Sequence, residues 1–76
     1  MSEPGSFLES RVVEVILVKQ AALCDACLAT ALNETVAAVT TAARSLATNS
    51  FTFERHVTAC AGCERMTEVT DWRSRR

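Results

Sequence analysis

Four cysteines are the residues of this sequence best suited to chemistry, and they form two Cys-x-x-Cys pairs. Cys24 and Cys27 stand in "LCDAC", and Cys60 and Cys63 stand in "ACAGC". Two intervening residues allow a tight turn to aim both sulfurs at one atom, and Zn²⁺ binds four thiolates at tetrahedral corners about 2.3 Å away. The pattern C-x2-C-x32-C-x2-C therefore predicts a structural four-cysteine zinc site.

Each pair has a local reason to hold negatively charged sulfur. The first pair lies at the start of a predicted helix, where free backbone N–H groups favour the thiolate. Gly62, inside the second pair, can adopt the positive φ that a turn around a metal often requires. Arg55 and Arg65 are close to this turn in the sequence, so we expect them to offset the net negative charge of four thiolates around one Zn²⁺.

Other interpretations of the cysteines stay open. They could be buried free thiols, form two disulfides, or include a redox-active pair, which usually accompanies a βαβ pattern that this sequence lacks. His56 could replace one cysteine as a ligand, although four cysteines already complete the shell; otherwise we expect it to be a surface residue of a strand. A closed shell has no open coordination position, so the site is expected to be structural rather than catalytic.

The composition explains why a metal would be needed. A chain of 76 residues makes one domain at most and buries only about 60% of its unfolded surface. Hydrophobic residues make up 49% of the chain, but many are alanine and only 5% of the residues are aromatic. A core this thin points to additional stabilisation by a metal, a disulfide or a partner.

The sequence shows no targeting or membrane segment. Its N-terminus, "MSEPGSF", lacks the basic region and apolar run of a signal peptide. The longest apolar run, "VVEVILV", is seven residues long and far too short for a membrane span. We therefore expect a cytoplasmic protein without a membrane partner, and in that reducing compartment paired cysteines bind metals more readily than they form disulfides.

The elements that must position the cysteines are predicted to be three helices followed by a two-stranded hairpin, an α+β fold. Residues 1–6 are expected to be a flexible leader, residues 7–72 the domain and residues 73–76 a basic tail. From Phe7 onward apolar residues recur at helical spacing, with Ser6 as the N-cap, although the β-branched run also suits a strand.

Two further helices are predicted over residues 25–32 and 34–48, and Asn33 is well suited to cap the second of them. The inner face of the longer helix is expected to hold Val36, Val39, Ala43, Leu46 and Ala47. After residue 50 the polar–apolar period changes to two, so residues 51–59 and 64–72 are predicted strands, joined through "CAGC".

These motifs, in this order, resemble a group of small prokaryotic winged helix-turn-helix proteins with a zinc site. In that group a "CxxCLAxxL" helix is followed by a recognition helix ending in "RxLxxxG" and by a wing closed with "CxxCG". The matching segments here are "CDACLATAL", "ARSLATN" and "CAGCERMTEV". The resemblance implies Cys24, Cys27, Cys60 and Cys63 as zinc ligands, and the third helix as the element facing DNA.

The resemblance also implies a function, a zinc-stabilised DNA-binding protein that regulates transcription. Its contacts to double-stranded DNA would come from Thr41, Arg44, Ser45, Thr48, Arg73, Arg75 and Arg76. The alternative is an adaptor for a protein partner or a homodimer, because the outer face of the third helix is small and nearly uncharged and the net charge is −1. We expect no enzyme and no small-molecule substrate, since the sequence has no catalytic set and no phosphate-binding loop.

Overall fold

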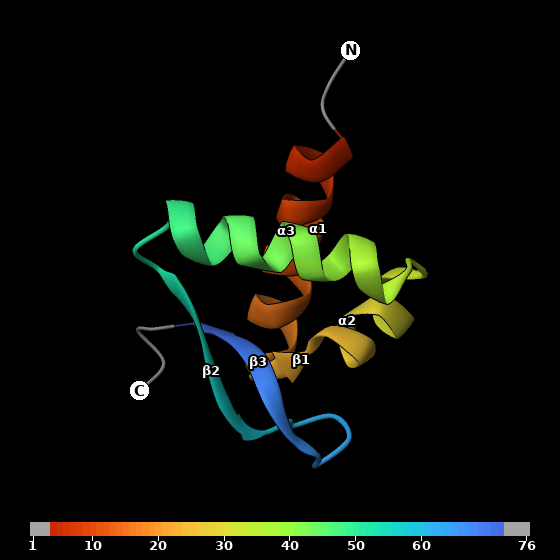
Figure 1. The fold of residues 1–76 in the computed structure, drawn as a ribbon, viewed down its shortest axis with the longest axis vertical. Helices are drawn as coiled ribbons and strands as arrows, with labels where there is room; N and C mark the ends of the chain where they lie inside the picture. The colour runs from red at the N-terminus through yellow and green to blue at the C-terminus, as the bar shows by residue number, and fades with distance from the viewer. Residues whose placement is uncertain (1–3, 73–76) are drawn as a thin grey trace.

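The structure, a computed structural model, describes the backbone of residues 4–72 and the side chains of residues 7–72. Within that range three helices stand above a three-stranded antiparallel sheet (Figure 1). The elements in chain order are α1 (Pro4–Lys19), β1 (Leu23–Cys24), α2 (Asp25–Leu32), α3 (Val36–Asn49), β2 (Phe53–Ala59) and β3 (Met66–Trp72). The α+β class is confirmed, and none of these helices is long and apolar enough to cross a membrane.

The sheet contains one strand more than the sequence predicted. Strand β1 pairs with β3 through Leu23 opposite Thr70 and Cys24 opposite Val69, so β3 lies between β1 and β2. A two-residue strand has no alternation that a sequence pattern could reveal. Strand β1 nevertheless matters for the candidate site, because it places Cys24 directly beside the hairpin.

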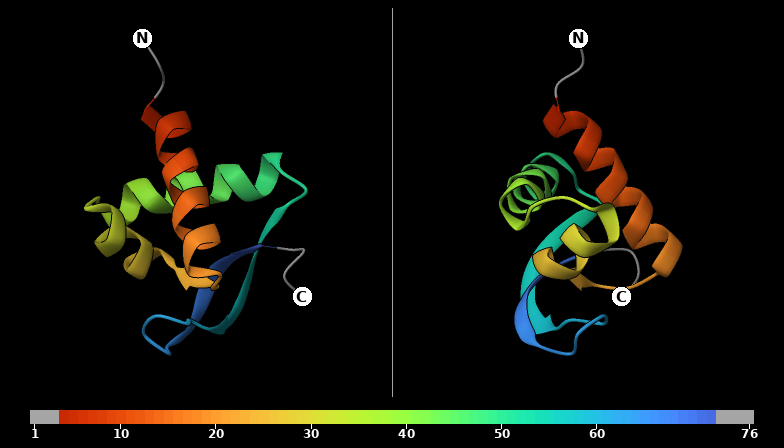
Figure 2. Two further views of the ribbon diagram at one scale, coloured as in Figure 1. Left: turned by 180° about the vertical axis from the view of Figure 1, so that it is seen from behind. Right: turned by 90° about the vertical axis from the view of Figure 1, so that its right-hand side faces the viewer.

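The core lies where α1 and α3 cross above the sheet (Figure 2). In α1 the stripe Leu8, Val12 and Ile16 repeats every four residues and is buried, the pattern of one helix face. The run "VVEVILV" is therefore helical. Leu28 of α2 and Val69 of β3 are also 0% exposed, so all layers contribute to one apolar cluster.

Several predicted helix ends are wrong. Helix α1 begins at Pro4, so Ser6 lies inside the helix rather than at its cap; proline fits a first turn because no N–H is needed there. Asn33 ends α2 after Leu32, as predicted, and does so in the left-handed conformation with φ 58°, but it does not cap α3. Thr35 is the cap of α3, and its Oγ1 accepts a hydrogen bond of 3.2 Å from the amide of Ala38.

The inner face of α3 is also rotated slightly from the prediction. Val39, Ala43 and Leu46 are buried as expected, and Ala42 joins them. Val36 is 50% exposed instead, because it begins the helix beyond the edge of the core. The buried stripe consists largely of alanine and valine, which allows α1 to approach α3 closely.

Candidate metal centre

The four cysteines form one cluster, as the sequence predicts. Their sulfur atoms all lie within 4.8 Å of one another. The Sγ atoms of Cys24 and Cys63 are 3.8 Å apart and those of Cys27 and Cys60 are 3.6 Å apart. A disulfide would need about 2.05 Å, and all four thiols are free. Thiolates at 2.3 Å from a tetrahedral ion are about 3.8 Å from each other, so the two printed separations are close to those expected around such an ion.

Two separate parts of the chain supply the cluster. Cys24 ends β1 and is the N-cap of α2, and Cys27 lies in the first turn of that helix. The other two cysteines belong to the tip of the hairpin between β2 and β3. There the amide of Ala61 donates to the carbonyl of Ala22 at 3.0 Å, which joins the tip to the segment before β1. The long spacing between the pairs is thus occupied by α2, α3 and β2.

The Cys60 sulfur lies in a nest of backbone amides. The amides of Cys24 and Gly62 both donate to it at 3.3 Å. Burial alone would raise the pKa of this thiol, but the backbone N–H groups of Cys24, Cys63 and Gly62 outweigh burial and lower the pKa to about 6. The amide nest therefore favours the thiolate of Cys60, whose charge would attract a cation.

The first pair behaves differently from the expectation. Burial raises the pKa of Cys24, even though the amide of Cys27 at the helix start lowers it. Burial and the neighbouring sulfurs raise the pKa of Cys27 to about 12. The helix start favours the Cys24 thiolate as predicted, since the Cys27 amide lowers its pKa, but desolvation exceeds this effect. A cation at the cluster would supply the missing stabilisation and displace these protons.

Gly62 is needed for space and not for a positive φ. No glycine within the described residues has a positive φ; Glu64, with φ 65°, takes that conformation in the turn. A Cβ atom on Gly62 would lie 3.0 Å from the Cys27 sulfur and 3.4 Å from a methyl of Leu23. The backbone of the tip therefore touches the first pair directly at this point.

Arg55 does not offset the charge of the sulfurs. Its guanidinium is 6% exposed and holds Asp25 through two hydrogen bonds, Nη1 to Oδ1 at 2.9 Å and Nη2 to Oδ2 at 3.0 Å. Burial raises the pKa of Asp25, but hydrogen bonds from Arg55 and Thr40 outweigh it and lower this pKa. Because Asp25 stands between Cys24 and Cys27, this pair fixes the start of α2 against the hairpin.

The network around Arg55 spans four elements. Arg55 of β2 also donates to Thr70 at 2.9 Å and to Glu68 at 2.8 Å, both on β3. Thr40 of α3 donates to Asp25 of α2 at 2.7 Å. Sequence reasoning missed this network, because only the fold brings residues 30 positions apart into contact.

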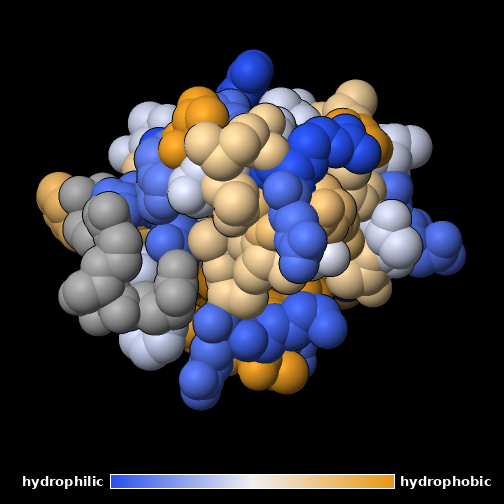
Figure 3. Space-filling view, turned by 90° about the horizontal axis from the view of Figure 1, so that it is seen from below, coloured by the Kyte–Doolittle hydropathy of each residue, from blue (hydrophilic) through white to orange (hydrophobic). Residues whose placement is uncertain are grey.

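The cysteine cluster is buried on one side and open on the other. Cys24 and Cys60 are buried, whereas Cys63 is exposed. A shallow hollow of about 350 Å³ reaches Cys27 and Cys63, and Arg65 lies at its edge, so Arg65 remains a candidate to offset sulfur charge. Figure 3 shows the molecule from below, the side on which the hairpin tip lies in Figure 1, and weakly hydrophobic residues gather across the middle of this face.

The residues predicted to contact DNA are only partly together. Thr41, Arg44 and Thr48 are exposed on α3, but Ser45 is half-buried and its Oγ accepts a hydrogen bond from Asn49. Arg44 and Thr48 line a hollow whose other walls include two carboxylates, Glu54 and Glu68. Arg73, Arg75 and Arg76 lie outside the described residues.

His56 lies apart from the cysteines, beside Glu54 and Asp71. It is half-buried, with 31% of its side chain exposed, and is not the plain surface residue that the sequence predicted. The alternation of β2 already places Glu54 and His56 on one face. The position of Asp71 beside them could not be predicted from the sequence, because it depends on the register of the neighbouring strand.

Comparison of the chain with protein-family models, with curated proteins and with solved structures gave no significant match.

Proposed function

We propose that the chain is a winged-helix module, stabilised by zinc, that binds double-stranded DNA and regulates transcription. The observation that carries the metal part is the sulfur spacing of 3.6 and 3.8 Å, which matches the edge of a tetrahedral Zn²⁺ site with four thiolates. Cys24, Cys27, Cys60 and Cys63 would hold the ion, and soft sulfur ligands select zinc over hard cations such as Mg²⁺. The ion would supply folding stability rather than chemistry.

The topology supports the winged-helix part of the proposal. A helix, a short strand, two helices and a hairpin follow one another, and β1 pairs with β3 at the edge opposite β2. This order is compatible with the proposed winged helix-turn-helix, in which the last helix would enter the major groove and the hairpin would be the wing. Helix α3 would be the recognition helix here, since Thr41, Arg44 and Thr48 are exposed along it.

The charges around α3 set the expected strength of DNA binding. Arg44 is the one basic residue of α3, and Glu54 and Glu68 share its hollow. DNA affinity comes largely from cations that release counterions from phosphates. Arg44 and the three arginines of the tail would provide about four phosphate contacts. We therefore expect weak binding by one chain, and stronger binding by a pair of chains on adjacent half-sites.

Titration of the zinc-loaded protein with duplex DNA at several salt concentrations tests this function. Four phosphate contacts predict that log K falls with log salt with a slope of about −3 to −4. Arg44→Ala should reduce the slope by about one, whereas Glu14→Gln, on the exposed side of α1, should leave the slope unchanged. Absence of binding at the lowest salt would contradict DNA binding but leave the metal centre intact.

A protein-interaction module on the same scaffold is the second candidate, and exposed apolar residues of the hairpin favour it. Val57 is 68% exposed on β2, Met66 is 69% exposed on β3, and Phe51, just before β2, is 96% exposed. Val57 stands opposite Glu68, two residues from Met66, so these two side chains are neighbours on one face of the hairpin, and neighbouring exposed apolar side chains often belong to an interface. Self-association that Val57→Lys abolishes, without DNA binding, would support this function instead.

A further inference from the structure

We propose a second metal site on the sheet, formed by Glu54, His56 and Asp71, which binds one exchangeable divalent transition-metal ion such as Zn²⁺, Co²⁺ or Ni²⁺. The site is separate from the cysteine cluster. It lies toward the end of the hairpin where β2 begins and β3 ends, whereas the cysteines lie at the opposite end.

The register of the two strands creates the site. Glu54 of β2 stands directly opposite Asp71 of β3, and His56 stands opposite Val69, two residues from Asp71. Side chains two positions apart share one face of a strand, and cross-strand neighbours on that face lie close enough to touch. The three side chains therefore converge from adjacent positions of one sheet face.

The donor atoms already lie at nearly metal-binding distances. One ligand atom from each of the three residues falls within 4.8 Å of the other two. The Nδ1 atom of His56 is 3.6 Å from Oε2 of Glu54, and its Nε2 atom is 3.9 Å from Oδ2 of Asp71. Ligands at 2.0 to 2.2 Å from one ion are about 3 to 3.6 Å apart. The two contacts use different ring nitrogens, so the imidazole or one carboxylate must turn to place one nitrogen and two oxygens around a single ion.

One ring nitrogen of His56 has no hydrogen bond beside the two carboxylates. Both separations from His56 are too long for a hydrogen bond, and its buried Nδ1 atom has no hydrogen-bond partner. Asp71 is 1% exposed, and its Oδ1 accepts a hydrogen bond of 2.8 Å from the amide of Trp72. That bond orients the carboxylate, as an outer-shell contact does for a metal ligand.

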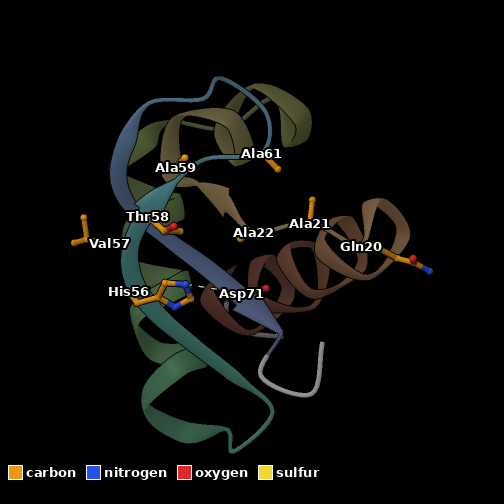
Figure 4. Close-up of a pocket in the computed structure, with 9 residues that line it drawn as sticks. All are labelled: Gln20, Ala21, Ala22, His56, Val57, Thr58, Ala59, Ala61 and Asp71. Carbon is orange, nitrogen blue, oxygen red and sulfur yellow. Dashed lines mark ion pairs between the residues drawn. The ribbon is translucent and has the colours of Figure 1, made fainter. Parts of the chain in front are cut away.

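The site is open to a small molecule or to water. His56 and Asp71 line a hollow of about 460 Å³, and the segment from Gln20 to Ala22 forms its other side (Figure 4). Three protein ligands fill only part of the coordination shell of a transition-metal ion, so solvent from this hollow would complete it. An open shell with one nitrogen and two oxygen donors should bind more weakly than four thiolates, and the ion should exchange.

The donor set decides which cations fit. Imidazole favours Zn²⁺, Co²⁺ and Ni²⁺, whereas Mg²⁺ and Ca²⁺ prefer oxygen alone. The thiolate cluster takes its zinc first, because soft sulfur ligands bind that ion far more tightly. The second site would therefore fill only when free cation is present, as a site that senses metal does.

Titration of the zinc-loaded full chain with Co²⁺ tests the proposal. We expect one additional ion per chain, with the weak d–d absorption of nitrogen and oxygen ligands and no thiolate charge-transfer band. His56→Ala and Glu54→Gln should each weaken this binding at least tenfold. Glu14→Gln removes one carboxylate charge from an exposed position of α1 and should not change it.

Three results would overturn the proposal. The first is a stoichiometry that stays at the single ion of the cysteine cluster. The second is Co²⁺ binding that is equal in the wild type and in both site variants. The third is a thiolate charge-transfer band, which would show that cobalt had replaced zinc among the cysteines. Because two different ligands are varied, the test remains decisive if one variant fails to fold.

Discussion

The two ends of the hairpin hold two clusters of residues that could bind a metal ion, and the clusters differ in what they connect. At the tip, four sulfurs join β1 and α2 to a turn 33 to 39 residues later. At the other end, Glu54, His56 and Asp71 come from two strands that already pair with each other. A cation at the tip closes a long loop of chain and therefore contributes to folding. A cation at the other end would find its ligands already placed.

The comparison predicts that removing metal from the tip has the largest effect on the molecule. A structural zinc in a small domain contributes on the order of 10 kcal/mol, which equals the whole stability of such a chain. A strong chelator, or Cys60→Ser in the amide nest, should unfold the protein near room temperature, as followed by circular dichroism. If the metal-free chain keeps its fold in the chelator, the claim that a metal at the four cysteines stabilises the fold is wrong.

The buried pair of Arg55 and Asp25 should have the next largest effect. Arg55→Met leaves the Asp25 carboxylate without its two hydrogen bonds, and breaking a buried ion pair from one side costs about 3–5 kcal/mol. Glu68→Gln is the matched control on the same guanidinium, because Glu68 is 47% exposed and should change stability by less than about 1 kcal/mol. Urea unfolding of the zinc-loaded variants measures both, and equal losses would contradict this assignment.

The sequence allowed prediction where the signal is local. The bounds of α2 agree with the structure, and the two Cys-x-x-Cys pairs meet as expected. In both cases the informative residues stand within a few positions of one another. The helical repeat of Leu8, Val12 and Ile16 likewise overrode the strand preference of "VVEVILV".

Sequence reasoning failed where a position depends on pairing across the fold. Strand β1 is two residues long and exists only through its bonds to β3. Asp71 joins His56 only because of the strand register, and Arg55 pairs with Asp25 rather than with the nearby cysteines. Gly62 shows a subtler failure, since glycine signals freedom of φ but serves here to clear the Cys27 sulfur.

Gly62→Ala tests whether Gly62 is needed to leave space for the Cys27 sulfur, and its effect on stability should be intermediate. The added methyl would lie 3.0 Å from the Cys27 sulfur, so either the tip or the sulfur must shift, at a cost of about 1–3 kcal/mol. A sulfur held by an ion cannot move freely, and zinc affinity should therefore fall by tenfold or more in a chelator competition. Ala61→Ser, an exposed change in the same turn, should leave the affinity unchanged.

The smallest effect is expected at the other end of the hairpin when the second cation is absent. His56 is 31% exposed and contacts its two carboxylates only beyond hydrogen-bond distance, so His56→Ala should alter the free energy of unfolding by less than about 1 kcal/mol. Urea unfolding of the zinc-loaded protein measures this difference. Excess Co²⁺ should then stabilise the wild type and not His56→Ala, because a ligand that binds only the folded state adds RT ln(1 + [L]/Kd). Equal stabilisation of both proteins would show that cobalt binds without His56 and would contradict the second site.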